Sequence, residues 1–135
     1  MTDSEFSYRP AHMTSILMED GRSEAEWTPA GAWANPMGNV HGGYLGVLVD
    51  DVAGMALLSL IGMSAATVNL QVDYLEAMPL GLTYRARGEV VRAGKATAIV
   101  DVHVYNPDDV LVARGKCYFQ LPSAWRDRVS RDAGG

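Results

Sequence analysis

The stretch from Asn35 to Gly43 has the residue types needed for chemistry on a carbonyl group. It reads Asn-Pro-Met-Gly-Asn-Val-His-Gly-Gly and runs directly into a long apolar segment. If that segment is a helix, Gly42 and Gly43 place backbone N–H groups at its positive end. Such groups suit a carbonyl oxygen that becomes negative in a transition state. A glycine pair at this position is equally typical of a tight turn, so both interpretations stay open at this point.

His41, Asp50 and Asp51 are the titratable side chains around this stretch. His41 has three roles open to it: satisfying a turn, transferring a proton or orienting a substrate. A metal is disfavoured, because His12 and His103 do not provide ligand spacing. An acid in the middle of a helix commonly lies on a solvated face. In a segment that is apolar nearly all round, a carboxylate that faces a sheet or an interface is the second interpretation, and both stay open at this point. Buried carboxylates have raised pKa values and often serve function.

The spacing of His41 and Asp50 carries a geometric consequence. They are nine residues apart in the sequence. In one helix this separation is roughly 13.5 Å along the axis and about 180° around it. The two side chains therefore cannot meet within one helix. Either they come from two subunits to form one site, or only one of them matters.

The segment from Gly42 to Ile61 is predicted to be one long helix that stops at Gly62. Its apolar residues recur at spacings of three and four: Leu45, Leu48, Val49, Val52, Ala56 and Leu60. The segment also contains Gly43, Gly46 and Gly54. Each internal glycine costs a helix up to about 1 kcal/mol relative to alanine. Their presence favours the close approach of another backbone to the helix.

Beyond Gly62 the hydrophobic period changes to two, which is typical of strands. Four such segments are predicted, over residues 68–74, 84–92, 98–105 and 110–121. The short separators between them are rich in glycine, proline, asparagine and aspartate, which favour turns. One long helix followed by strands joined by short turns indicates an α+β fold with an antiparallel sheet. The sheet must bury the helix, since no other segment is large enough to do so.

The flanks are less regular. We predict an N-terminal arm or short helix over residues 1–26, with the helix around Ala11 to Met18, and a short strand within residues 26–33. The main domain is predicted to span residues 27–122. Residues 123–135 are polar and end in Gly-Gly, so we expect a flexible tail that is at most peripherally packed.

Length and composition limit the class of protein. The chain has 135 residues, of which 48% are hydrophobic and 20% charged, and this fits one globular domain rather than a disordered chain. Its single cysteine, Cys117, allows neither an intrachain disulfide nor a cysteine-based zinc site. The first ten residues lack the apolar core of a signal peptide, and no run of about 18 apolar residues predicts a membrane span. We therefore expect a cytoplasmic protein with no membrane partner.

Charge is distributed unevenly along the chain. The formal net charge is −5, which argues against nucleic acid as a partner. Residues 1–76 contain ten acids and two bases, whereas residues 77–135 contain six acids and nine bases. A basic surface on an acidic protein suits an anionic small molecule. For each single cation, however, a solvated strand edge is the more common explanation.

A joint pattern of these residues is similar to a known family. The pattern is Asn35-x-x-Gly38-x-x-His41-Gly42-Gly43 followed by Leu48-x-Asp50. It resembles the hotdog-fold acyl-CoA thioesterases, and within them the phenylacetate-degradation (PaaI-like) group, over roughly residues 27–121. The resemblance implies a central helix wrapped by a curved antiparallel sheet. It also implies dimers that share a continuous sheet and their active sites, and that usually associate into tetramers.

The resemblance further implies roles for individual residues. Asp50 matches the catalytic carboxylate, which acts as a general base on water or attacks the thioester itself. Gly42 matches the backbone N–H that polarises the carbonyl. Asn35 and His41 match polar residues that position the thioester and the water. Thr67 matches a hydroxyl that helps to hold the water, although the family has serine there.

The substrate of such an enzyme is an acyl-CoA, and the chemistry needs neither a metal nor an organic cofactor. Gly43 is a further candidate for contact with the substrate. The CoA phosphates are expected to meet a set of cations in which Lys95 is the first choice, followed by Arg92 and Arg114. Three alternatives stay open: a hydratase of the same fold, a protein that binds acyl-CoA without turnover, and a structural oligomer without a ligand.

Overall fold

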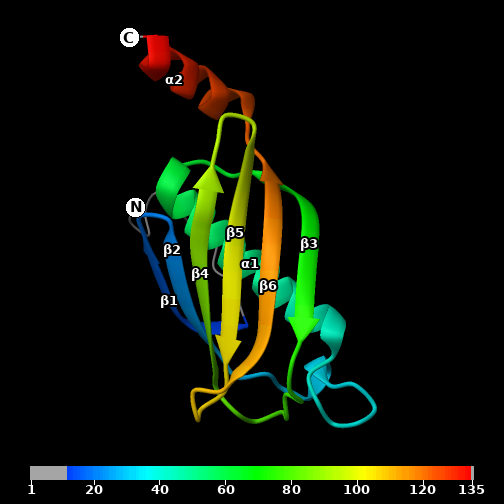
Figure 1. Ribbon diagram of the computed structural model, residues 1–135. Coiled ribbons are helices and arrows are strands. Elements are labelled where there is room, and N and C mark those ends of the chain that lie inside the picture. The colour runs from blue at the N-terminus through cyan, green and yellow to red at the C-terminus, as the bar shows by residue number, and fades with distance from the viewer. Residues whose placement is uncertain (1–11, 135) are drawn as a thin grey trace.

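An antiparallel sheet of six strands wraps around one long helix in the computed structural model, which describes residues 12–134 (Figure 1). The order of strands in the sheet is β1-β2-β4-β5-β6-β3. This arrangement confirms the α+β prediction and the hotdog fold. Along the chain the elements are β1 (Met13–Glu19), β2 (Arg22–Trp27), the short 3-10 helix η1 (Gly31–Trp33), α1 (Gly42–Ile61), β3 (Ala66–Tyr74), β4 (Tyr84–Ala93), β5 (Thr97–Tyr105), β6 (Leu111–Gln120) and α2 (Ser123–Gly134).

Helix α1 begins and ends where the sequence predicts. His41 caps its start, and Gly62 ends it in the left-handed conformation with φ 73°. Ten of its residues are buried against the sheet. By length and composition alone α1 could cross a membrane, but in this fold it is the core helix. Of the six apolar residues whose spacing predicts this helix, Leu60 is the one that is not buried, since its side chain is 44% exposed. Periodicity identifies a helical face without showing which turns the sheet covers.

Glycines do allow the sheet to approach the helix closely, but they lie in the strands. A methyl group placed on Gly88 of β4 would lie 2.9 Å from the Val52 carbonyl oxygen, and one on Gly115 of β6 would collide with Val49. A methyl group on Gly46 would come no closer than 3.7 Å to Leu70. The prediction of close backbone contact at the helix glycines is therefore wrong, and those positions leave space instead.

The N-terminal region is a β-hairpin rather than an arm or a short helix. Strands β1 and β2 pair with each other, and β2 also pairs with β4, so the predicted boundary at residue 27 falls within a strand of the sheet. Asp20 and Gly21 join the strands with positive φ at both positions. An Asp-Gly pair is a strong hairpin signal, and it outweighs the weak helical periodicity of this region. Residues 1–11 lie outside the described part.

The C-terminal segment is also ordered differently from the prediction. The expected flexible tail forms helix α2, which follows Pro122 and extends beyond one end of the sheet (Figure 1). The Trp125 indole N–H donates a hydrogen bond of 3.0 Å to the Gly94 carbonyl oxygen in the turn between β4 and β5. This single aromatic anchor holds an otherwise polar helix on the domain.

Candidate active site

One stripe of helix α1 is nearly bare of side chains. Gly42, Gly46, Asp50 and Gly54 are spaced by four residues, so they lie along one face of the helix. Asp50 is the only one of them with a side chain. A groove of about 440 Å³ lies over the first part of this stripe, and a pocket of about 300 Å³ lies over the second part. Asp50 lines both, so its carboxylate stands where the two hollows meet.

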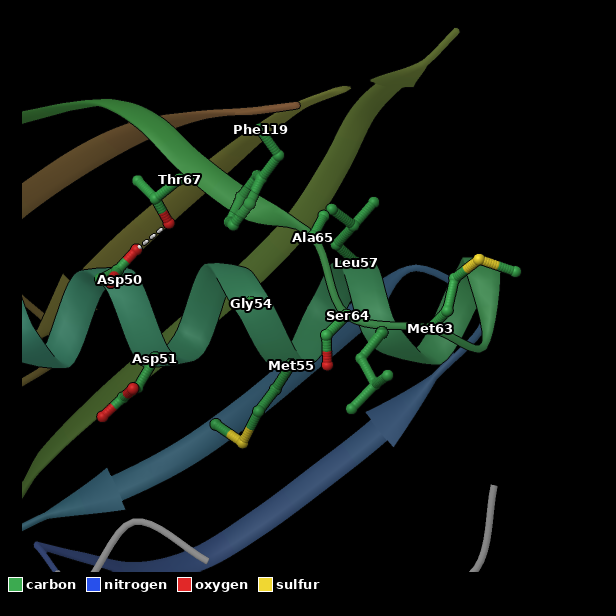
Figure 2. A pocket seen from close by; sticks show the side chains of 11 residues that line it. Asp50, Asp51, Gly54, Met55, Leu57, Met63, Ser64, Ala65, Thr67 and Phe119 are labelled. Carbon is green, nitrogen blue, oxygen red and sulfur yellow. Dashed lines mark hydrogen bonds between the residues drawn. The ribbon is translucent and has the colours of Figure 1, made fainter. Parts of the chain in front are cut away.

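The Asp50 carboxylate is held in place by strand β3. The Thr67 hydroxyl donates a hydrogen bond of 2.7 Å to Asp50 Oδ1 (Figure 2). Asp50 is half-buried, and within residues 12–134 no hydrogen-bond donor is found for its Oδ2 atom. The structure thus brings together two of the predicted site residues. One carboxylate oxygen is fixed by the protein, and the other is free to act on a substrate or a water.

Cys117 lies in the core close to this carboxylate. Burial, with a further contribution from the negative charge of Asp50, raises the pKa of the Cys117 thiol to about 12. The thiol is therefore protonated at neutral pH, and a thiol is a poor nucleophile in that form. Cys117 is part of the packing beneath the site rather than a reacting group.

The start of helix α1 presents one free backbone donor. The Gly43 N–H donates to Nδ1 of His41, at 3.1 Å. The Gly42 N–H, by contrast, has no acceptor within the described chain. The Tyr74 hydroxyl donates a bond of 2.9 Å to the Gly42 carbonyl oxygen and fixes this peptide. Of the two predicted glycines, Gly42 is thus the one whose N–H is available to a carbonyl oxygen.

The two ring nitrogens of His41 have different roles: Nδ1 caps the helix, and Nε2 is a potential donor. Because its Nδ1 accepts the Gly43 N–H, a neutral ring carries its proton on Nε2. The ring is therefore the N-cap of α1 and also offers an outward N–H donor. Its ring contacts Tyr44 edge-on at 5.9 Å between centroids.

Substitution of His41 can distinguish these roles. We expect His41→Ala to lower the free energy of unfolding by about 1 kcal/mol, because the cap is lost, and His41→Asn to retain it. Neither variant has a donor at the position of Nε2, so kcat should fall by about tenfold in both, the equivalent of one hydrogen bond. Chemical denaturation and steady-state kinetics measure the two effects. Full activity of His41→Asn would limit His41 to capping.

Asn35 organises the loop that precedes the helix. Its Oδ1 accepts the backbone N–H groups of Met37 and Asn39, at 2.9 Å and 3.1 Å. Gly38 completes this turn with φ 79°, a conformation that favours glycine. Because its Oδ1 is occupied by these two bonds, the group that Asn35 can offer to a ligand is its NH₂ donor. Asn35 lines a hollow of about 500 Å³ together with Gly42 and Tyr74.

The predicted residues therefore form two groups within one chain. Asp50 and Thr67 form one group at mid-helix, and Asn35, His41 and Gly42 form the other at the helix start. Gly42 and Asp50 are separated by eight residues, or about 12 Å along the helix axis. The structure confirms that one helix does not bring His41 to Asp50.

The three cations predicted to bind the CoA phosphates lie in two separate parts of the sheet. Lys95 lies in the β4–β5 turn, and Arg92 lies beside it at the end of β4. Arg114 lies on β6, where it forms an ion pair of 2.9 Å with Asp73 of β3. The β5–β6 register places Arg114 beside His103, far from the turn that carries Lys95. Arg114 is therefore separated from the other two cations and already has a carboxylate partner.

Asp51, the neighbour of Asp50, contacts a histidine that precedes β1. Its Oδ2 lies 3.3 Å from Nε2 of His12, and both side chains are largely buried. Burial lowers the pKa of His12, so this ring is less readily protonated than an exposed histidine. Figure 2 shows Asp51 directed away from Thr67. This placement indicates a structural rather than a catalytic role for Asp51.

Two features of the site escaped sequence reasoning. The Gly-Gly-Asp-Gly stripe at spacing four is visible in the sequence, but the close-contact interpretation of Gly46 and Gly54 does not identify it as an open face. The contact between Tyr74 and Gly42 joins residues 32 positions apart, and no local pattern indicates it. Both features shape the space in front of Asp50.

Gly54 provides a test of that space. Within the described chain no heavy atom lies within 4 Å of a methyl group placed on Gly54. We expect Gly54→Ala to raise the free energy of unfolding by about 1 kcal/mol through helix propensity. The methyl group narrows the pocket beside Asp50, so kcat/KM should fall for bulky thioesters and change least for small ones. Thermal denaturation and a substrate-size series check both effects; unchanged selectivity would show that substrates do not enter this pocket.

Comparison with known proteins decides the family. The pattern of the thioesterase superfamily matches residues 37–113, which is more than half of the chain. This chain belongs to the thioesterase superfamily. The matched residues of this thioesterase include α1, β3, β4 and β5, and so contain Asp50, Thr67 and Gly42.

Individual relatives agree with this family. Human acyl-coenzyme A thioesterase 13 is 31% identical over 77% of this chain and 76% of its own. A protein of Streptococcus mutans UA159, solved bound to acetyl CoA, has a TM-score of 0.78 with 28% identity and covers 87% of this chain and 94% of that chain. The PaaI protein of the Escherichia coli phenylacetic acid degradation operon has a TM-score of 0.75 with 25% identity, covering 80% of this chain and 78% of that one. The resemblance found in the sequence is thereby confirmed, and this thioesterase is a thioester hydrolase.

Proposed function

We propose that this thioesterase hydrolyses acyl-CoA thioesters to a free acid and CoA, and that Asp50 is the catalytic carboxylate. The observation that carries this proposal is the position of Asp50. Thr67 holds one of its oxygens, and the other, which has no donor among residues 12–134, borders a groove whose lining includes Gly42 and Gly46. The substrate class is supported by the human relative, an acyl-CoA thioesterase, and by the acetyl CoA bound to the relative from Streptococcus mutans.

The chemistry needs two groups that act together. The Gly42 N–H donates to the thioester oxygen and stabilises the negative charge that develops there. The free oxygen of Asp50 either removes a proton from an attacking water or attacks the carbonyl carbon itself. In both routes the carbon–sulfur bond breaks and CoA leaves as a thiol. Single-turnover hydrolysis in ¹⁸O-water tests the covalent route: if water attacks the Asp50 carbonyl of the mixed anhydride, the label enters the Asp50 carboxylate, whereas direct attack of water on the thioester places it in the product acid.

Strand β3 supports a homodimer. It is an edge strand of the sheet and pairs only with β6 among the described strands. Three of its apolar side chains are strongly exposed: Val68 at 59%, Leu70 at 40% and Tyr74 at 58%. A long exposed edge of this kind is prone to pair with another chain. A second copy of β3 is the partner that closes this edge by two-fold symmetry.

The contacts at the two ends of β3 determine which site residues meet across this dimer. Near its start, Thr67 binds Asp50, and at its end, Tyr74 binds Gly42. In an antiparallel pair of β3 strands, the start of one strand lies beside the end of the other. Asp50 of one protomer therefore approaches the Asn35, His41 and Gly42 group of its partner. We propose that each active site is shared in this way.

Leu70, at the middle of β3, offers a test of the shared edge. We expect Leu70→Lys to dissociate the dimer and to abolish most activity, because it places like charges next to the two-fold axis. The matched control is Leu17→Lys on β1, the other edge strand, where Leu17 is 63% exposed. Light scattering and thiol release measure assembly and turnover. A fully active monomer in Leu70→Lys would overturn the shared site.

Further parts of the proposal follow from the sequence. We propose that the dimers associate into tetramers and that the enzyme works in the cytoplasm without a metal or organic cofactor. Among the described residues, no group of three or more histidine, cysteine, aspartate or glutamate side chains is placed to hold a metal ion. Retention of turnover after dialysis against a chelator is the expected result.

Thiol release from a panel of acyl-CoAs, aromatic and medium-chain, tests the function directly. We expect turnover, and the panel ranks the acyl groups. No turnover with any thioester, together with tight acyl-CoA binding by calorimetry, would overturn hydrolysis in favour of binding without chemistry.

A further inference from the structure

The cations of this protein differ in whether they have an acidic partner. On the outer face of the sheet, Arg85 pairs with Asp109 at 2.8 Å, Arg87 with Glu24 at 3.7 Å and Arg114 with Asp73 at 2.9 Å. At the end of the sheet that carries α2, the described carboxylates form no ion pair with Arg92, Lys95 or Arg128. Helix α2 also carries Asp127 and Asp132, but Arg92, Lys95 and the three arginines of α2 outnumber them, so the charge at this end is positive on balance.

Trp125 brings these cations together. Its indole N–H binds the Gly94 carbonyl oxygen, and the Arg128 guanidinium lies over its ring at 5.7 Å from the centroid. A methyl group placed on Gly94 would lie 3.7 Å from Nε of Arg92. Trp125 thus links Arg128 to the turn that carries Lys95 and lies beside Arg92, and we name these three cations, with Trp125, the turn–helix cluster. Figure 1 shows α2 at the same end of the molecule as the β4–β5 turn.

The sheet register relates this cluster to Asp50. Thr67, which binds Asp50, pairs with Phe119 of β6, and Phe119 pairs with Ala98 of β5. The lateral separation of Thr67 and Ala98 is thus two strand spacings, or about 10 Å. Lys95 lies three residues before Ala98, in the turn. The pocket beside Asp50 is also lined by Ser64, Ala65, Thr67 and Phe119, so it extends towards this end of the sheet.

We propose that helix α2 completes a binding subsite for the phosphates of CoA. Arg128 binds phosphate together with Lys95 and Arg92, and Trp125 is a positioning residue that holds Arg128 over the turn. This inference rests on the proposed function, and it adds Arg128 and Trp125, which lie outside residues 37–113 that match the family. A guanidinium binds phosphate oxygens through two parallel hydrogen bonds, which a surface without fixed cations cannot provide.

The position of the cluster suits the shape of the substrate. CoA carries its phosphates at the end of a long pantetheine arm, far from the thioester. The arm can leave Asp50, pass Thr67 and reach the β4–β5 turn along one end of the sheet. The cluster then binds only the part of the substrate that does not react. Its loss should therefore weaken binding of acyl-CoA without altering the chemical step.

A pair of substrates tests this assignment. We expect Arg128→Ala to raise KM for an acyl-CoA by about tenfold, the equivalent of one charge-assisted hydrogen bond, with kcat unchanged. The same acyl group on N-acetylcysteamine has no phosphate, so its kinetics should be equal in both proteins. Arg128→Lys should restore part of the affinity. Arg22→Ala, an exposed position on β2, is the matched control and should leave both KM values unchanged.

Trp125→Phe isolates the positioning role. It removes the hydrogen bond to Gly94 but keeps an aromatic ring, so KM for acyl-CoA should rise with kcat unchanged. A KM for acyl-CoA that is unchanged in Arg128→Ala would overturn the subsite. An equal rise for acyl-CoA and for the N-acetylcysteamine thioester would also overturn it, because it would indicate a structural defect.

Binding without turnover separates this inference from the proposed function. Titration calorimetry with adenosine 3′,5′-bisphosphate, a fragment of CoA that lacks the thioester, measures the subsite alone. We expect its affinity to fall by about tenfold in Arg128→Ala and to decrease with salt. If the wild type hydrolysed neither thioester, the proposed function would fail, and this titration would still decide the subsite. Equal affinity in wild type and Arg128→Ala would overturn it.

Discussion

Asp50→Asn is expected to lower kcat for acyl-CoA hydrolysis by about 10³-fold, within the range of effects for a positioned acid–base group. The substitution keeps the size of the side chain and its acceptor oxygen for Thr67, so the fold and the assembly should persist. It removes the negative charge that activates water or attacks the carbonyl. Thiol release measures the loss, and light scattering checks the assembly.

The neighbouring carboxylate serves as the control for this prediction. Asp51→Asn makes the same chemical change one position further along α1, at a side chain that contacts His12 instead of Thr67. Its kcat should stay within a few-fold of wild type. Turnover by Asp50→Asn close to that of wild type would refute the assignment of the carboxylate.

Gly42→Pro is expected to lower kcat by about 10²–10³-fold, because it removes the N–H that stabilises the developing oxyanion. Gly42 is the first residue of α1, where proline is well tolerated and the lost N–H has no helical partner. His41 precedes it with φ −66° and ψ 133°, a conformation that allows a following proline. The helix should therefore form normally in this variant.

Crowding by the new side chain needs its own control. A Cβ atom on Gly42 would lie 3.1 Å from the Tyr74 hydroxyl, so this side chain must shift by a few tenths of an ångström. Gly42→Ala introduces the same Cβ atom and keeps the N–H. The kcat ratio between the alanine and proline variants thus isolates the backbone donor. Equal kcat values in these two variants would show that the Gly42 N–H is not the oxyanion donor.

Mixing the two inactive variants tests whether the site is shared. In a mixed dimer of Asp50→Asn and Gly42→Pro, one shared site carries both substitutions and the other carries neither. After subunit exchange of equal amounts, random two-fold pairing restores about a quarter of wild-type activity. If each site lay within one protomer, every site would carry one substitution and the mixture would stay inactive.

Much of the fold follows from local patterns in the chain. The limits of α1 are determined by the apolar periodicity and by Gly62, and the four strands that follow it by alternation and turn residues. These features depend on neighbours along the chain, so a single sequence suffices to predict them. The Asp20-Gly21 pair of the first hairpin is an equally local signal, and the prediction of an arm or short helix there is wrong because this turn pairs β1 with β2. Asn35, His41, Gly42 and Asp50 could be selected because their types and joint spacing suit chemistry on a thioester.

Only the tertiary structure decided how these residues are used. The Thr67 hydroxyl meets Asp50 because β3 passes over the middle of α1, and this packing joins residues 17 positions apart. The same packing determines which peptide is free at the helix start, since the His41 ring takes the Gly43 N–H and leaves that of Gly42. Trp125 orders a polar segment by one long-range bond to Gly94. Each of these contacts depends on distance in space, and that distance is determined by how the sheet wraps the helix rather than by spacing along the chain.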